Sequence, residues 1–97
     1  MTEFDTLAQN YKVALLRYLP RQEEAPLYSG YKLGRSALLS RLSILHLVQI
    51  HHDVLLELLR DTPKEDLVQI ATAASDFFRE VLSSYDMLQR EYREVED

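Results

Sequence analysis

The three histidines of the chain are the side chains best suited to metal binding or general-base catalysis. His51 and His52 are adjacent, His46 precedes them by five residues, and the carboxylates Asp53 and Glu57 lie close by in the sequence. Adjacent residues of a helix point about 100° apart, so we expect His51 on the core face, His52 on its flank and His46 on the opposite side. No pair at i, i+4 with a third ligand can be assembled, so the sequence predicts no metal site.

His51 is instead interpreted as a buried, neutral imidazole that is hydrogen-bonded to a neighbouring tyrosine or a backbone carbonyl. A histidine of this kind reduces stability when falling pH forces it to take a charge. A second hypothesis makes the protein a small-molecule sensor that holds its ligand between helices near His51. A polar, roomy cavity beside that residue would favour the sensor.

No other group of residues points to catalysis. The chain has no cysteine, which excludes disulfides, thiolate zinc sites and cysteine nucleophiles together. No Ser-His-Asp set, glycine-rich phosphate loop or acidic metal cluster can be assembled, and the carboxylates near the C-terminus are interpreted as a solvated face. We therefore predict a protein that is not an enzyme and needs no cofactor.

One face of the second predicted helix is the best candidate for binding another protein. At 100° per residue, an aromatic, two cations and an aliphatic side chain lie side by side there: Tyr28, Lys32, Arg35 and Leu39. Tyrosine and arginine are common anchors of protein interfaces, and the acidic residues Glu23 and Glu24 nearby would set the orientation of a partner. The alternative is a solvated flank whose tyrosine covers the edge of a bundle.

Composition and charge narrow the class of partner. With 97 residues, 46% of them hydrophobic and 28% charged, the chain is expected to form one small globular domain. Its net charge of −5, without a cluster of Lys and Arg, argues against nucleic acids and anionic membranes. The acidic N-terminus does not resemble a signal peptide, and no apolar run approaches the ~20 residues of a membrane span, so we expect a cytoplasmic protein.

Apolar residues follow helical spacing throughout, which predicts an all-α domain of four helices. The expected spans are residues 3–19, 26–41, 44–59 and 63–94, in a single domain over residues 1–97. Pro20 ends the first helix, Pro26 opens the second, and Ser43 is the expected N-cap of the third. Thr62-Pro63-Lys64-Glu65 has the pattern of a capping box and predicts the start of the fourth.

The second helix carries a glycine on its expected core stripe, which consists of Leu27, Tyr31, Gly34 and Leu38. A glycine inside a helix costs about 1 kcal/mol relative to alanine. We therefore interpret Gly34 as room for the close approach of another helix.

The fourth predicted helix continues an apolar pattern for longer than a small bundle can cover, about 45 Å at 1.5 Å per residue. Its later apolar positions repeat with 4-3 spacing, typical of a coiled-coil seam: Val81, Tyr85, Leu88, Tyr92 and Val95. We predict that these residues form the seam of a homodimer. The alternative is an ordinary long helix of the bundle.

Several short motifs resemble the N-terminal domain of RsbU-type phosphatases, the module that precedes a metal-dependent serine phosphatase domain in the bacterial general stress response. The resemblance covers nearly the whole chain. It rests on Leu27-Tyr28, Lys32 and Gly34-Arg35, on Ile50-His51 with Val54-Leu55, and on Asp76-Phe77-Phe78-x-Glu80-x-Leu82 followed by Ser84-Tyr85-Asp86-Met87.

The resemblance implies an all-helical homodimer that recruits a switch kinase of the RsbT type and thereby turns on an attached phosphatase, in a pathway that controls a sigma factor. By matching position, Tyr28 and Glu24 would belong to the partner surface, and Arg79 and Ser83 of the last helix would complete it. The effector domain itself lies outside this chain. Related domains precede sensor histidine kinases, so a purely structural dimerisation domain of such a protein is the alternative.

Overall fold

The computed structural model describes residues 2–96, and the side chains of residues 2–93. Its four α-helices are α1 (Glu3–Tyr18), α2 (Glu24–Leu39), α3 (Ile44–Arg60) and α4 (Leu67–Glu96), and a 3-10 turn (Lys64–Asp66) precedes α4. No strand occurs in this part of the chain. The prediction of an all-α domain with four helices is confirmed.

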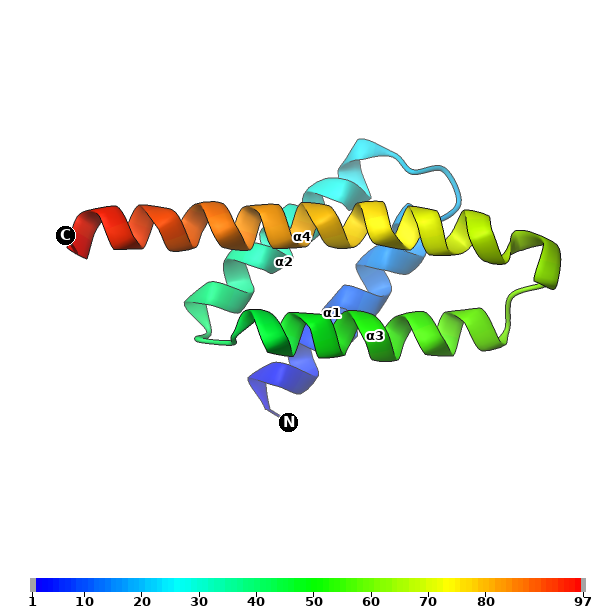
Figure 1. Cartoon of the computed structure of the whole chain (residues 1–97), viewed down its shortest axis with the longest axis horizontal. Helices are drawn as coiled ribbons and strands as arrows, with labels where there is room; N and C mark the ends of the chain where they lie inside the picture. Colours follow the sequence, from blue (N-terminus) through cyan, green and yellow to red (C-terminus); the bar gives the residue numbers. More distant parts are fainter. Residues whose placement is uncertain (1, 97) are drawn as a thin grey trace.

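The helices form two crossed layers. Figure 1 shows α3 and α4 side by side in the near layer, with α1 and α2 crossing behind them. α2 packs against α1 and α4, and α3 packs against the same two helices, so α2 and α3 lie diagonally across the bundle. The molecule measures 50 × 28 × 18 Å, and the C-terminal end of α4 projects beyond the other helices (Figure 1).

Capping boxes fix the starts of two helices. Thr2 accepts a hydrogen bond from the backbone N–H of Asp5, whose carboxylate accepts one from the backbone N–H of Thr2. The predicted N-cap of α3 is confirmed, because Ser43 Oγ accepts from the N–H of His46. His46 Nδ1 in turn accepts a hydrogen bond from the N–H of Ser43 at 3.0 Å, so this histidine completes the capping box of α3.

The start of α4 differs from the prediction. Thr62 does not cap the following helix, because its hydroxyl donates to the carbonyl of Leu58 in the preceding one at 2.7 Å. Pro63 is followed by the 3-10 turn, and regular helix begins only at Leu67. The capping-box prediction was therefore wrong here, because a threonine hydroxyl can bond to the end of the preceding helix or to the start of the following one.

The start of α2 also differs by two residues from the prediction. The helix begins at Glu24, so Pro26, which has no backbone N–H, lies in its first turn, where no hydrogen bond is lost.

α2 ends in a motif that usually contains glycine. Arg41 has a left-handed backbone, with φ of 63°, and its N–H donates to the carbonyl of Leu38. The N–H of Leu42 reaches back to the carbonyl of Ala37, which completes a Schellman motif. Without a glycine, the sequence holds no signal for this helix end.

The core is built around the aromatic residues of α1 and α4. Phe77 is completely buried, with its ring centroid 5.3 Å from that of Tyr11 and 5.6 Å from that of Tyr18. Leu15, Leu47, Ile50 and Val81 are the other large hydrophobic side chains with almost no exposed surface.

Gly34 lies at a close contact between α2 and α4, as predicted. A Cβ placed on it would lie 2.2 Å from the backbone oxygen of Val81 and 1.9 Å from Ser84 Oγ. The rest of the predicted stripe of α2 is only partly right. Leu27 and Leu38 pack against the core while partly buried, but the fully buried residues of the helix are Gly30, Leu33, Gly34 and Ala37. The two glycines present the least bulk, so α2 turns this side to α4 and leaves Tyr31 half-buried at the edge.

Candidate functional site

A ladder of tyrosines and cations runs along the exposed side of α2. The rings of Tyr28 and Tyr31 stack with centroids 5.8 Å apart and planes 11° from parallel. Lys32 Nζ lies 5.2 Å from the centre of the Tyr28 ring, and the Arg35 guanidinium lies 5.9 Å from that of Tyr31. These are cation–π distances. Each ring is thus held by its neighbours, although Tyr28 remains 59% exposed.

Two hollows of different charge flank this ladder. One, of about 330 Å³, is lined by Leu27, the two tyrosines and the carboxylate-bearing Glu24 and Glu80. The other, of about 360 Å³, lies between α1 and α2 and is lined by the cations Arg17 and Lys32 without any carboxylate. A partner that covered both hollows would meet negative charge on one side and positive charge on the other.

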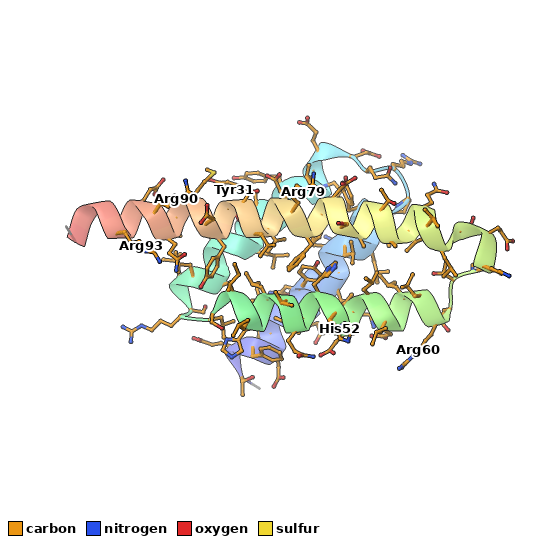
Figure 2. The ribbon with its side chains drawn as sticks, in the orientation of Figure 1. Tyr31, His52, Arg60, Arg79, Arg90 and Arg93 are labelled. Atoms are coloured by element: carbon orange, nitrogen blue, oxygen red, sulfur yellow. The ribbon has the colours of Figure 1, made fainter. Side chains whose placement is uncertain are left out.

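The predicted partner residues are only partly brought together. Tyr28, Lys32 and Arg35 form the ladder with Tyr31, and Glu24 lines the acidic hollow. Leu39 is exposed at the C-terminal end of α2. The remaining two, Arg79 and Ser83, are exposed on α4, but the α4 residue that lines the hollow is Glu80. Figure 2 shows Tyr31 and Arg79 along the same edge of α4.

Sequence reasoning missed Tyr31 and Glu80. Tyr31 was assigned to the core stripe, and its half-exposed ring belongs to the ladder instead. The signal was present in the sequence, because positions 28, 31, 32 and 35 have the i, i+3 and i, i+4 spacing that brings side chains together on a helix. No comparable signal pointed to Glu80, which comes to Tyr31 only through the packing of α4 on α2.

His51 is half-buried at the edge of the core, and it pairs with a tyrosine, one of the two partners predicted for it. Its Nδ1 lies 2.6 Å from the hydroxyl of Tyr11, and its ring stacks on Phe78 with centroids 4.1 Å apart. Burial raises the pKa of the Tyr11 phenol, so this hydroxyl stays protonated. The Phe78 ring and the Tyr11 hydroxyl lie directly against His51. His51 lines neither the hollow between α1 and α2 nor the one of about 580 Å³ between α1 and α3, so these contacts do not favour the sensor hypothesis.

The free energy of unfolding is expected to fall as the pH drops below about 6.5. Burial, with a smaller contribution from neighbouring His52, lowers the pKa of His51 in the folded chain below its ordinary value of 6.5. Below that pH the unfolded chain binds a proton that the folded chain resists, so stability rises with pH through this range and is lost on acidification. Denaturant titrations at about pH 7 and about pH 5.5 measure the slope.

The His51→Gln variant is the control for this pH dependence. It should flatten the slope, because glutamine keeps a polar side chain without a titrating proton. An unchanged slope would assign the pH dependence to other groups.

The predicted coiled-coil seam needs correction. Val81, Tyr85 and Leu88 are buried inside a single chain, at 0%, 5% and 4% exposure, so they are not available to a second one. The close approach at Gly34 brings α2 along this stretch of α4, and the Tyr85 hydroxyl donates to the carbonyl of Leu42. Tyr92 is about half-exposed on the projecting end of α4, and the side chain of Val95 lies outside the described residues.

The described residues form neither a metal-binding cluster nor a membrane-spanning helix. No group of three His, Asp or Glu side chains among them gathers closely enough to hold a metal ion. None of their helices is both long and apolar enough to cross a membrane.

Comparison with known proteins identifies the family of this helical bundle. No curated protein and no solved structure matches the chain. The family model of the N-terminal domain of phosphoserine phosphatase RsbU matches residues 9–88, from the middle of α1 to Leu88. Leu88 is also the last buried residue of α4 in the described part of the chain. Since the match spans the packed bundle, the chain belongs to the family of RsbU phosphatase N-terminal domains.

Proposed function

We propose that this protein is a regulatory domain that recruits a signalling protein through the ladder side of α2. The partner is a switch kinase of the RsbT type or a similar protein, and its binding controls an attached or associated phosphatase in stress signalling. Membership of the RsbU family supports a regulatory role.

The ladder of Tyr28, Tyr31, Lys32 and Arg35 is the observation that carries this proposal. Fixing a rotamer-rich side chain on binding costs roughly 0.5–1.5 kcal/mol, and a tyrosine, with only two side-chain torsions, loses less. Stacking on Tyr31 and the Lys32 contact already restrict the Tyr28 ring. A large, amphipathic side chain held ready in this way is typical of an interface hot spot.

The charges around the ladder support a directional interaction. The acidic hollow of Glu24 and Glu80 lies on one side of Tyr28, and the basic groove of Arg17 and Lys32 lies on the other. Complementary charges on a partner would favour one docking orientation and oppose the reverse. A surface without a binding role is not expected to separate acidic and basic residues in this way.

We also propose that the domain acts as a homodimer. Partner binding then changes how the two α4 helices are arranged at their C-terminal ends. Tyr92 lies on the projecting end, where a second α4 could reach it. A binding event shifts such a helix pair only as far as the partner's affinities for its two arrangements differ. A purely structural dimerisation domain remains the alternative function, and it would bind no protein except itself.

Replacing Tyr28 by alanine is expected to weaken kinase binding by at least about thirtyfold, the effect of losing about 2 kcal/mol at a hot spot. The melting temperature and helicity should stay nearly unchanged, because Tyr28 is exposed in the free domain. Calorimetric titration with the purified RsbT-type kinase of the native host measures the affinity, and circular dichroism measures the stability.

Val68→Ala is the matched control, because Val68 is also exposed but lies at the start of α4, away from the ladder. It should bind the kinase like the unchanged chain. If Tyr28→Ala bound equally well, the ladder would not be the partner surface. A pull-down from the native host is the further control. If the unchanged chain bound no kinase and the pull-down captured only further copies of the chain, the purely structural dimerisation domain would be the better interpretation.

A further inference from the structure

The groove between α1 and α2 has a charge opposite to that of the domain as a whole. Its volume is about 360 Å³, and its lining includes the cations Arg17 and Lys32 but no carboxylate. The chain has 16 acidic residues and only 11 basic ones. Four other hollows of the described surface each contain at least one carboxylate: Glu24, Glu3, Asp53 and Asp61 are examples, one from each. This basic groove is therefore a place where an acidic partner can approach an acidic domain.

The two cations of the basic groove are not neutralised by the chain itself. Among the described residues, ion pairs form at Lys12, Arg21 and Arg90, and none of these pairs includes Arg17 or Lys32. A carboxylate that enters the groove therefore does not have to displace one that belongs to the chain.

The shape of the basic groove fits a stretch of protein better than a single small anion. Asn10 and Arg17 on α1, and Ser29 and Ser36 on α2, are lining residues seven positions apart, which is about 10 Å along a helix. Asn10 and Ser36 also line the next hollow, of about 170 Å³, so the depression continues along the two helices. The amide and hydroxyl groups can form hydrogen bonds to a bound segment.

Lys32 connects the basic groove to the ladder. Its ammonium group lies over the Tyr28 ring, and the same side chain lines the groove. A protein that covers Tyr28 therefore also reaches Lys32, and the groove begins directly beside it.

We infer that the basic groove receives an acidic segment of the protein that docks on the ladder, and that Asp or Glu carboxylates of this segment pair with Arg17 and Lys32. The inference rests on the function proposed above and specifies the charge that the partner must present. Elsewhere on the domain an acidic segment is repelled by the net charge of −5, so the groove also fixes where the segment binds.

The Arg17→Glu variant tests this inference. Its dissociation constant for the purified RsbT-type kinase of the native host should be at least about tenfold higher at low ionic strength, because a repelling charge replaces an attracting one. The difference from the unchanged chain should shrink in about 0.5 M salt, since exposed charges are screened there. Calorimetric titration measures both affinities, and circular dichroism shows whether the variant is folded.

Arg60→Glu is the matched control. Arg60, like Arg17, is an exposed arginine in the last turn of its helix, so the two variants change the net charge and the helix end in the same way. Arg60 lies at the C-terminal end of α3 (Figure 2) and lines neither hollow beside the ladder. Its variant should bind the kinase within about twofold of the unchanged chain. An equal loss in both variants would assign the effect to net charge and overturn the inference.

Charge exchange identifies the partner's carboxylate. Surface Asp and Glu residues of the kinase are replaced one at a time by lysine, and each kinase variant is titrated with the unchanged chain and with Arg17→Glu. One of these variants should bind Arg17→Glu more tightly than the unchanged kinase does, because the opposite charges meet again in reversed order. If no replacement restored binding, the acidic segment would be overturned.

Three results separate this inference from the function on which it rests. If Tyr28→Ala weakened kinase binding and Arg17→Glu did not, the ladder would stand as the partner surface and the groove would be overturned. If the kinase did not bind the unchanged chain, both would fail. If inorganic phosphate at about 1 mM saturated NMR shifts of Ser29 and Ser36 while Arg17→Glu bound the kinase normally, the groove would hold a small anion instead.

Discussion

Replacing Gly34 by alanine is expected to destabilise the domain by about 3 kcal/mol or more, at the upper end of the range for overpacking a core. The added Cβ would stand 2.2 Å from the backbone oxygen of Val81 and 3.0 Å from the backbone nitrogen of Tyr85. Backbone atoms of a helix cannot turn aside as a side chain can, so α2 and α4 would have to separate. Alanine's better helix propensity, about 1 kcal/mol, offsets only part of this cost.

Urea denaturation followed by circular dichroism measures the effect, and Gly30→Ala is the matched control. A Cβ at Gly30 would lie 3.0 Å from the edge of the Phe77 ring, which can shift by a few tenths of an ångström. We expect its stability to stay within about 1 kcal/mol of the unchanged chain.

A second variant separates the backbone contact from the serine. Adding Ser84→Ala to Gly34→Ala removes the hydroxyl that would stand 1.9 Å from the new Cβ but leaves the Val81 carbonyl in place. The double variant should therefore remain unstable. Ordinary stability of Gly34→Ala would contradict so close an approach of the two helices.

The Phe77→Ala variant is expected to lose about 3–5 kcal/mol of stability, the usual range for removing a buried phenylalanine. Phe77 has no exposed surface and packs against the rings of Tyr11 and Tyr18, so its removal leaves a cavity and two rings without a partner. In a domain of this size the melting temperature should fall by about 15 °C or more. Since domains have only about 5–15 kcal/mol in total, much of the protein could unfold at growth temperature.

Neighbouring positions provide internal controls for Phe77. Phe78→Ala should cost less, because that ring is half-exposed and stacks on His51. Adding Gly30→Ala to Phe77→Ala should restore about 1 kcal/mol, since the new methyl group points into the vacated space and favours the helix. A simple sum of the two single effects measured separately would argue that the residues do not share a cavity.

The sequence was most informative where structure depends on neighbours within one helix, although the Thr62 motif and the end of α2 are exceptions. Apolar spacing indicated four helices, and Ser43 marked the start of the third because a capping serine acts on residues only a few positions away. Gly34 pointed to a close helix contact, because a glycine costs helix stability unless a neighbouring backbone needs the space. The place of His51 on the inner side of its helix indicated a hydrogen bond to a tyrosine or a backbone carbonyl, and the packing of α1 on α3 makes that partner Tyr11.

The candidate site was predictable only along α2. The spacing of Tyr28, Lys32 and Arg35 puts them on one face whatever surrounds the helix. Tyr31 was misplaced because the two glycines of α2, rather than its largest side chains, decide which side meets α4. Glu80 and Arg17 join the surface from other helices, so their part in it depends on packing.

The length and periodicity of α4 were likewise determined by the sequence, but its partner was not. A heptad pattern is satisfied equally by a helix of the same chain or of another, because both offer the same apolar stripe. The tertiary structure decides between them through Gly34, which lets α2 cover Val81, Tyr85 and Leu88. The order of residues in α4 therefore determined which of them must be buried, and only the packing of the four helices decided that α2 buries them.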